Sequence, residues 1–415
     1  MNETKKTSPL ILVPAALLFY LVYASVMKEI KNPLSDVNGH VCVYLITFLQ
    51  DGFFAGWKEV PYCMWHLPVL FLYRVLNVPL EAGAALTSGF FAAFGYLVTY
   101  WMIRRYADSR APEVSDFAAS ILALGFSLVQ GLYFYWMDAG ERFTGIFSMN
   151  PLHNPTHMAV RPFALLCFAL VVDLWGAQED ETYLGIFFPV ELSRKKYNLL
   201  LAVFLFLSAM AKPVFAEMFI PAVALLMLIR LIRLAFRRDG SATPYFRECL
   251  IMLLCAVPAL VYILFQFLAY FFWGGSYASD GSFAVTRWME VWHLFSDNVL
   301  LSILCGMAFP IYMIVIDASF FIRHRIGRLS LAGYGIGLLE AACLGESGVK
   351  LSHGDFLWPM MCGMLLLFMS ATLHALQLEH SPVIGKGRRA LVWVGWTLLL
   401  AHVFCGITYL YTLLV

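Results

Sequence analysis

The sequence predicts an all-α membrane protein that crosses the bilayer many times. Of its 415 residues, 61% are hydrophobic and only 13% are charged, whereas soluble domains carry about 25% charged residues. Apolar runs recur along the whole chain, and they reach the roughly 20 residues that a helix needs to cross a bilayer. No stretch between these runs is long enough for a large soluble domain. We therefore expect a single membrane-embedded domain, residues 1–415.

The apolar runs predict about eleven membrane-spanning helices. The first run is long and no small-residue cleavage site follows it, which favours an uncleaved span over a signal peptide. A later stretch, 65–76, is apolar but too short to span, and it is predicted to be an interfacial or re-entrant helix. The eleven spans are expected at 9–27, 81–103, 115–137, 158–175, 198–212, 213–234, 248–272, 298–321, 329–345, 357–378 and 390–414.

The distribution of lysine and arginine predicts the orientation. With the N-terminus in the cytoplasm, the inner loops carry about twice as many of these residues as the outer loops, as the positive-inside rule requires. The outer loops are then the longer ones. They hold most of the histidines, namely His40, His66, His153, His157, His293 and His353. We therefore expect the functional site on the outer face.

Several classes of function lack support in the sequence. The nine cysteines stand singly, without the C-x-x-C pairs of zinc sites or a disulfide framework. The phosphate-binding loop, the H-E-x-x-H zinc motif and the G-x-S-x-G nucleophile elbow are all missing. The net charge of +1 gives no indication of nucleic acid as a partner.

The first outer loop, residues 28–80, gathers acids and imidazoles where a structural spacer has no need of them. Apolar residues between positions 39 and 54 recur at helical spacing, which predicts helices lying along the membrane interface. Asp36 and His40 lie four residues apart and share one helical face, although Asp36 can also be a simple helix cap. Asp51 is followed by Gly52 and also fits a turn, and His66 beside Trp65 also fits an interfacial position. The candidate site residues of this loop are Asp36, His40, Asp51 and His66.

A second polar cluster precedes the fourth expected span, where the chain reads NPLHNPTH from Asn150. It contributes His153, Asn154 and His157 as candidate substrate-binding residues. Arg161 follows in the first turn of an apolar span. An arginine at such a place either extends back to the membrane surface or binds an anion.

Two further outer segments carry charge. Lys212 lies in a very short connection between two spans, close to the hydrocarbon, so it needs a carboxylate or a bound anion as its partner. Glu217, at helical spacing, is the candidate carboxylate. The loop from Glu346 to Pro359 adds His353 and Asp355, which fit a sugar-binding site or a turn at Gly354.

The order of these features resembles the GT-C superfamily of multi-pass membrane glycosyltransferases, in particular uncharacterised bacterial members. The segments that carry the resemblance are Asp36–His40, Leu49–Gly52, Tyr62–Pro68, His153–Thr156 with Arg161-Pro162, Lys212-Pro213 and His353–Trp358. The resemblance implies an enzyme of the bacterial plasma membrane that moves a sugar from a polyprenyl-phosphate-linked donor to a cell-envelope glycan or lipid acceptor.

The resemblance also implies roles for residues. Asp36 becomes the candidate catalytic base, with His40 beside it, and Arg161 and Lys212 become candidates for binding the lipid phosphate. No adjacent acidic pair follows the first span, which departs from the family's pattern. A divalent ion is compatible with this chemistry, but one acid with histidines does not require it.

Two alternatives remain open at this stage. A polymerase or ligase of lipid-linked oligosaccharides would use similar outer residues on larger substrates. A transporter or flippase of lipid-linked sugars would need ionisable residues within the spans and an internal repeat. Glu340 lies inside the ninth expected span, and Asp173 and Asp317 lie toward inner span ends.

Overall fold

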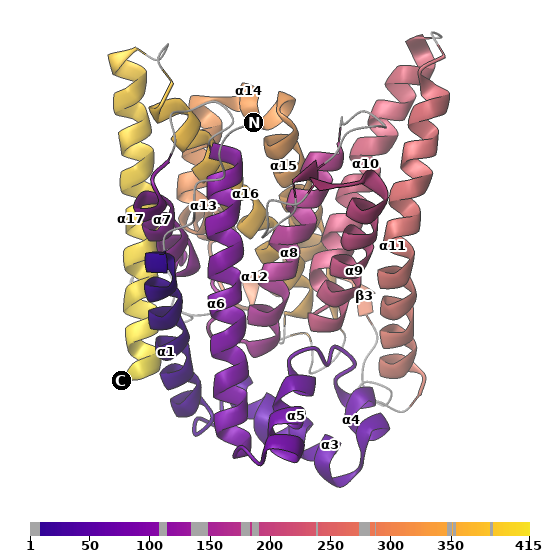
Figure 1. Cartoon of the computed structure of the whole chain (residues 1–415), viewed down its shortest axis with the longest axis vertical. Coiled ribbons are helices and arrows are strands. Elements are labelled where there is room, and N and C mark those ends of the chain that lie inside the picture. The colour runs from indigo at the N-terminus through magenta and orange to yellow at the C-terminus, as the bar shows by residue number, and fades with distance from the viewer. Residues whose placement is uncertain are drawn as a thin grey trace.

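The computed structural model describes residues 9–107, 114–133, 148–175, 183–184, 191–237, 240–273, 283–286, 288–346, 351, 354–381 and 385–415. Within these ranges the chain is built almost entirely from helices that run roughly parallel to one long axis (Figure 1). Eight of the described helices are long and apolar enough to cross a membrane. The expectation of an all-α polytopic membrane protein is therefore confirmed, whereas the number of eleven spans is not.

The eight helices fall on expected spans, because long apolar runs are the strongest signal a membrane sequence gives. They are α1 (Leu12–Glu29, preceded by the 3-10 turn η1, Pro9–Ile11), α6 (Leu80–Ala107), α8 (Pro155–Leu174), α10 (Val214–Arg237), α11 (Ala242–Phe271), α13 (Val299–Ile316), α16 (Trp358–Glu379, preceded by the 3-10 turn η5, Asp355–Leu357) and α17 (Lys386–Leu414).

Three expected spans differ from these eight. Helices α9 (Arg194–Ala211) and α15 (Arg325–Cys343) have 18 and 19 residues, but each begins with polar turns and is less apolar. Both pack against other helices of the bundle, α9 against α8 and α11, and α15 against α10 and α16. Helix α7 (Asp116–Ser127) has only 12 residues and covers half of the expected span 115–137.

The chain unwinds after α7, and the reason lies in distant helices. Leu132 N–H donates to the carbonyl of Cys305 (3.0 Å), and Gln130 N–H donates to the carbonyl of His402 (3.1 Å). The His402 Nδ1 atom contacts the Gln130 carbonyl at 2.7 Å, and its Nε2 atom accepts from Phe309 N–H at 3.4 Å. Unwound backbone is tolerated at this depth only where protein groups satisfy it.

The break in α7 faces a second break. Helix α13 has non-helical backbone angles at Met307 (φ −124°, ψ 18°) and contains Pro310. This irregularity frees the backbone groups of Cys305 and Phe309 that the unwound segment and His402 bind. Because Nε2 accepts and Nδ1 donates, His402 is held as the neutral Nδ1–H tautomer.

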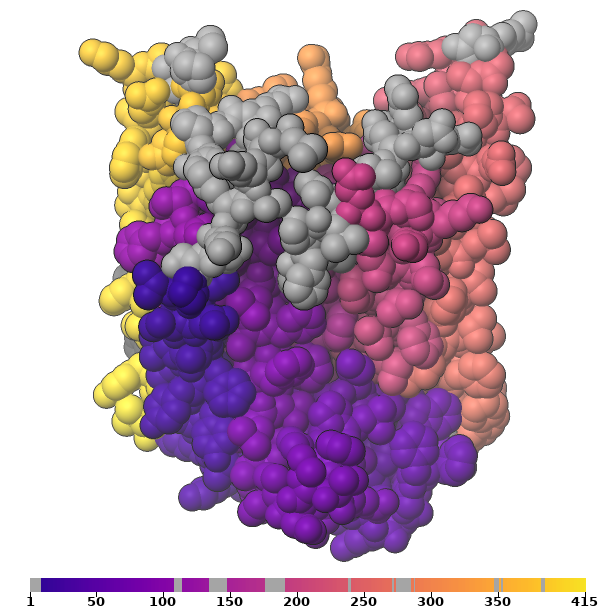
Figure 2. Space-filling model, viewed as in Figure 1, coloured from indigo at the N-terminus to yellow at the C-terminus, as the bar shows by residue number. Residues whose placement is uncertain are grey.

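The segment between α1 and α6 forms short helices at one end of the bundle (Figure 1). They are α2 (Asp36–Gly39), the π-helical turn η2 (His40–Leu45), α3 (Ile46–Gln50), α4 (Phe53–Glu59) and α5 (His66–Leu76). Figure 2 shows this segment as a continuous cap over the lower end of the visible face. We call this end, which also carries Lys212 and β4, the loop face.

Small elements complete the fold. Strands β1 (Tyr183–Leu184) and β2 (Glu191–Leu192) pair antiparallel, as do β3 (Phe283–Val285) and β4 (Leu344–Glu346), with Ala284 opposite Gly345. The short helices α12 (Glu290–His293) and α14 (Ala318–Arg323) precede α13 and α15.

The opposite end of the bundle carries the basic helix ends, and we call it the arginine-rich face. Its helix ends include Arg104, Arg105, Arg194, Arg230, Arg233, Arg237, Arg325 and Arg328.

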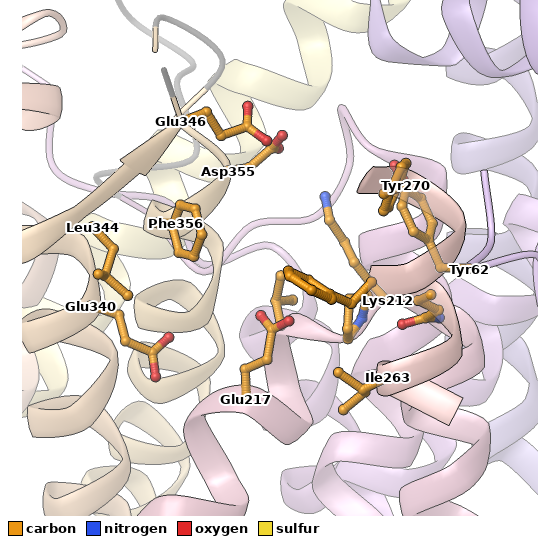
Figure 3. A pocket seen from close by; sticks show the side chains of 14 residues that line it. Tyr62, Lys212, Glu217, Ile263, Tyr270, Glu340, Leu344, Glu346, Asp355 and Phe356 are labelled. Carbon is orange, nitrogen blue, oxygen red and sulfur yellow. The ribbon is translucent and has the colours of Figure 1, made fainter. Parts of the chain in front are cut away.

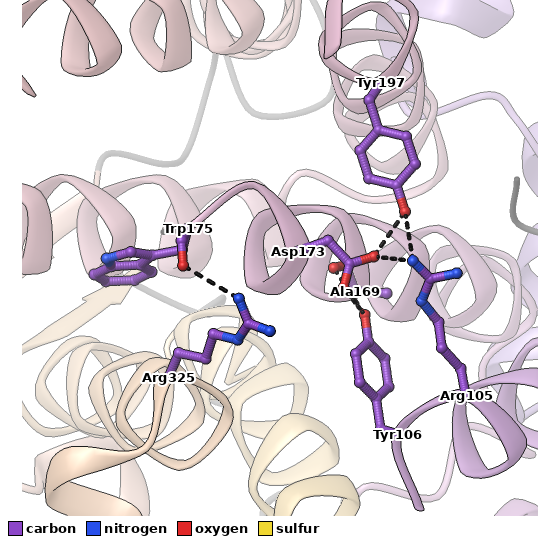
Figure 4. Close-up of polar contacts among 7 residues, drawn as sticks. All are labelled: Arg105, Tyr106, Ala169, Asp173, Trp175, Tyr197 and Arg325. Atoms are coloured by element: carbon purple, nitrogen blue, oxygen red, sulfur yellow. Dashed lines mark hydrogen bonds and ion pairs between the residues drawn. The ribbon is translucent and has the colours of Figure 1, made fainter. Parts of the chain in front are cut away.

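Asp173 of α8 ties three helices together at this face (Figure 4). Its carboxylate accepts from Arg105 Nη2 (2.6 Å), Tyr106 Oη (2.9 Å) and Tyr197 Oη (2.7 Å). Arg105 and Tyr106 belong to α6, and Tyr197 belongs to α9. Asp173 therefore has a packing role, and it gives no support to an ion pathway.

Candidate functional site

A cavity of about 470 Å³ lies at the loop face between α10, α11 and α15. Its size is in the range of about 300–1,000 Å³ that is common for small-molecule sites. The first loop closes it through Tyr62, and β4 and η5 contribute the wall opposite (Figure 3). The lining consists of Tyr62, Lys212, Pro213, Val214, Glu217, Ile263, Gln266, Phe267, Tyr270, Glu340, Leu344, Glu346, Asp355 and Phe356.

Lys212 is the only lysine or arginine among these lining residues. It follows the last residue of α9 in extended conformation, and its N–H caps the helix by donating to Ser208 O (2.9 Å). The side chain is 6% exposed and its ammonium points into the cavity (Figure 3). The Nζ atom lies 3.7 Å from the centre of the Trp358 ring, a cation–π distance.

The ammonium of Lys212 has no ion pair with any carboxylate in the described part of the chain. Glu217 lines the same cavity but does not form the predicted pair. Burial lowers the pKa of Lys212, and the negative charges of Asp355 and Asp36 oppose that effect. A buried cation that faces a cavity is a candidate for binding an anion.

Four carboxylates line the same cavity as this cation. Glu217 and Glu340 project from α10 and α15, and Glu346 and Asp355 lie together on the opposite wall (Figure 3). The sequence pattern indicates Glu217 only as a partner for Lys212, and Glu340 only as a feature compatible with transport. Ionisable residues inside apolar helices are the signal that could have assigned both to a site.

Backbone contacts fix the first loop beside Lys212. Met64 N–H donates to Met210 O (3.0 Å), two residues before Lys212. From α11, Tyr262 Oη donates to Pro61 O (2.6 Å) and Gln266 Nε2 donates to Ala209 O (2.9 Å). These contacts explain why residues far apart in sequence share one cavity wall.

His40 and His66 are hydrogen bonded to each other, with 3.0 Å between Nδ1 of His40 and Nε2 of His66. Both side chains are buried. Burial lowers the pKa of His66 to about 3 and lowers that of His40 as well, to which the charges of His66 and Lys212 add. Both imidazoles are therefore neutral, and one of them donates the N–H of the hydrogen bond while the other accepts it. His40 points to His66 rather than to Asp36.

Asp36 lies in the first turn of α2 and is exposed, outside the cavity lining. It is not the helix cap, because Ser35 Oγ accepts from Asn38 N–H at 3.2 Å. Its carboxylate accepts from Asn154 Nδ2 at 3.0 Å. Asn154 in turn caps α8, with its Oδ1 accepting from His157 N–H at 2.9 Å. The structure thus brings the first and second polar clusters together.

His153 and His157 both lie against Trp358, with ring centroids 5.4 and 5.1 Å from it. Both ring nitrogens of His153 are buried without a hydrogen-bond partner among the described residues. Burial lowers the pKa of His153 to about 4, against the charge of Asp36, which raises it. Trp358 therefore contacts Lys212, His153 and His157.

Arg161 has a different environment from the one that sequence analysis predicts. It is 6% exposed, its Nη2 donates to Phe126 O at 2.7 Å, and its guanidinium lies 5.3 Å from the Phe126 ring. Phe126 lies in the last turn of α7, so Arg161 satisfies a carbonyl that the helix end leaves free. It neither lines the cavity with Lys212 nor extends to the surface, and we assign it a packing role.

Two other predicted residues stand apart from the cavity. Asp51 is exposed at the end of α3 and is followed by Gly52 with φ of 92°, so it occupies a turn. His353 lies outside the described residues. Among the residues that are described, no group of three or more His, Cys, Asp or Glu side chains is placed to hold a metal ion.

Comparison with known proteins does not identify a family for this chain. No protein-family model matches the chain, and no curated protein matches it.

Proposed function

We propose that this protein is a membrane glycosyltransferase that uses a polyprenyl-phosphate-linked sugar as its donor. The acceptor is a glycan or lipid of the cell envelope. In this proposal the chain crosses the bacterial plasma membrane about eleven times, with α9, α15 and the broken α7 counted as crossings. The N-terminus lies in the cytoplasm and the loop face points outward, which satisfies the positive-inside rule.

One observation carries the proposal: Lys212 offers a buried ammonium, with no carboxylate ion-paired to it among the described residues, to a cavity lined by aromatic rings and acids. A lipid phosphate supplies the missing anion. The rings of Tyr62, Tyr270 and Phe356 suit the apolar faces of a sugar. The cavity lies among membrane helices, where a lipid-linked substrate arrives from the side.

The chemistry requires a base and a group that stabilises the leaving phosphate. The bond between the sugar's anomeric carbon and the phosphate oxygen breaks, and a bond from that carbon to the acceptor oxygen forms. The acceptor's proton passes to a carboxylate, and the polyprenyl phosphate leaves with its charge beside Lys212. Each of these steps uses only groups of the chain and its two substrates.

Two carboxylates compete for the role of base. The charges of both act on Lys212, but Asp355 lines the cavity, whereas Asp36, the residue that the family resemblance indicates, lies outside the lining. We favour Asp355 for this reason. The His40–His66 pair and Asn154 then position the first loop and Asp36 rather than react.

The test uses the full chain in proteoliposomes with a panel of polyprenyl-phosphate hexoses and a membrane glycolipid extract as acceptor. Release of free polyprenyl phosphate is measured, because every transfer reaction yields it. Lys212→Met should weaken donor binding, and Lys31→Met, an exposed lysine at the same face, should not. Asp355→Asn should abolish release, whereas Asp36→Asn should only reduce it. The opposite ranking would return the base to Asp36, and release unaffected by Lys212→Met would refute the phosphate site.

A transporter of lipid-linked sugars is the second candidate, because Glu217 and Glu340 line the cavity from within helices, as a coupling site would. The same vesicles separate the two functions. Movement of intact donor across the membrane without release of polyprenyl phosphate would favour transport.

A further inference from the structure

A second cavity system lies near the arginine-rich face, at the other end of the bundle from Lys212. Three arginines without an ion pair among the described residues lie at this end of the bundle: Arg230 and Arg233 of α10 and Arg328 of α15. Two of them stack on aromatic residues that line the cavity system. The charges of Arg230 and Arg233 act repulsively on Arg328. We call these three residues the arginine cluster. Such a cluster is stable only where an anion or water compensates it.

Aromatic side chains support the cluster. The Arg328 guanidinium lies 5.0 Å from the centre of the Trp175 ring, and that of Arg230 lies 4.5 Å from the centre of the Tyr245 ring. Stacking of this kind fixes a guanidinium plane while leaving its N–H edges available. Trp175 and Tyr245 line a small cavity of about 20 Å³, together with the ion pair of Arg194 and Glu248 (3.5 Å).

Three hydrogen-bond donors of this region are buried without a partner among the described residues. They are Trp175 Nε1, Tyr245 Oη and Arg328 Nε. Tyr245 is only 5% exposed. Buried donors without partners are rare in folded proteins, and three beside one cation cluster indicate a group of acceptor atoms that belongs there.

The small cavity continues into an apolar groove of about 240 Å³ between α8, α9, α10 and α11. Val171, Val223, Met227 and Met252 line both spaces. Apart from Cys249, the groove is lined only by carbon-rich side chains, among them Leu201, Phe219 and Leu253. A ligand that occupies the groove and reaches the arginine cluster has an anionic end at the arginines and a hydrocarbon end toward the membrane centre.

We propose that this is a binding site for an anionic phospholipid, whose phosphate contacts the arginine cluster and whose acyl chain occupies the groove. A phosphate brings acceptor oxygens to the three donors and offsets the repulsion among the guanidinium groups. Basic pockets between membrane helices bind anionic head groups in this way. A soluble anion would match the arginines but would leave the groove empty. The site is remote from the Lys212 cavity, so it does not depend on the reaction there.

The test measures lipid binding to the full chain in detergent by native mass spectrometry. The probes are dioleoyl phosphatidylglycerol, dioleoyl phosphatidylcholine and sn-glycerol 3-phosphate. Wild type should retain one phosphatidylglycerol more tightly than phosphatidylcholine. Arg328→Gln should lower that affinity roughly fivefold, and Arg230→Gln with Arg328→Gln should lower it roughly 25-fold, since each arginine contributes about 1 kcal/mol to such binding. Arg237→Gln, an exposed residue two turns beyond Arg230 in α10, is the matched control and should change nothing.

A second pair of variants tests the groove. Ala224 is exposed and lines the groove, so Ala224→Phe fills it without disturbing buried packing, and it should weaken phosphatidylglycerol binding. Leu225→Phe, beside it but outside the lining, should not. Equal binding of the two phospholipids by wild type would overturn the proposal, as would equal effects of Arg328→Gln and Arg237→Gln. Displacement of phosphatidylglycerol by equimolar sn-glycerol 3-phosphate would show that the occupant is a soluble anion. Normal phosphatidylglycerol binding by Ala224→Phe would overturn the placement of the acyl chain in the groove.

Discussion

Replacing His402 by phenylalanine removes the side-chain contacts that hold the break in α7. The aromatic replacement preserves the ring contact with Phe368, whose centroid lies 5.1 Å away. It leaves the carbonyl of Gln130 without its 2.7 Å donor and the N–H of Phe309 without its 3.4 Å acceptor. The backbone bond from Gln130 N–H to His402 O (3.1 Å) remains, because it does not involve the side chain.

The magnitude follows from those two groups. A buried polar group left without a partner costs about 1–3 kcal/mol, so the variant should lose roughly 2–6 kcal/mol. Unfolding entropy near 2.1 cal/mol/K per residue gives about 0.9 kcal/mol/K over the 415 residues of the chain. The expected fall in Tm is therefore roughly 2–7 °C. His402→Asn, whose amide nitrogen takes the place of Nδ1, keeps the shorter bond and should lose about half as much.

The assay is thermal unfolding of the detergent-solubilised full chain, followed by the fraction that remains monodisperse after heating. Because the unfolding is irreversible, Tm depends on the heating rate, and the variants are ranked by Tm values measured at one heating rate. Phe404→Leu, a membrane-exposed change two residues further along α17, is the control and should shift Tm little. If His402→Phe unfolds at the temperature of wild type, His402 does not hold the break. A Phe404→Leu shift as large as that of His402→Phe would show the same.

Three further predictions follow from buried groups. Because burial lowers the pKa of His66 to about 3 from about 6.5 in the unfolded chain, the unfolded chain binds more protons between these values. Stability should therefore fall as pH drops below about 6.5, and His66 alone contributes roughly 1.4 kcal/mol per pH unit to that fall. His66→Asn should remove this contribution and make the fall of Tm between pH 7 and 5 shallower, while buried histidines such as His153 still contribute; an unchanged slope would contradict the assignment. Gly406→Ala places a β-carbon against the carbonyl oxygen of Leu128 and should abolish monodisperse expression, whereas Gly335→Ala, with open space around it, should express normally. Arg161→Met should lower Tm through the lost bond to Phe126 O and leave donor affinity unchanged; weakened donor binding would restore Arg161 to the phosphate site.

The sequence predicts most long helices well because apolar length is a local property. Helices α6, α8 and α17 begin and end within a few residues of their expected spans. The expectation fails at 115–137, where the apolar run continues past the end of α7. The hydrogen bonds that unwind this segment come from Cys305 and His402, and no local pattern reveals partners so distant in the chain.

For the site, too, the sequence predicts what depends on local pattern and misses what depends on distant contacts. Its residues were expected on one face because loops alternate across the membrane, and the contact between Asp36 and Asn154 joins two of the expected clusters. The direction of each side chain is not a local property. The pairing of His40 with His66 and the orientation of Arg161 toward Phe126 depend on how the helices pack. As a result, His40 points to His66 instead of Asp36, and Arg161 does not line the cavity in which the lipid phosphate is expected.

The broken helix α7 has a consequence for how this chain is assembled during synthesis. A helix of 12 residues is too short to enter the bilayer as an independent segment, which needs about 20. Its remaining backbone groups find their partner His402 only 272 residues after Gln130. The ribosome therefore releases α7 long before that partner exists, and the segment waits in a protected or interfacial position. Insertion of this part of the protein is completed only after α17 has been made, so biogenesis here is not sequential.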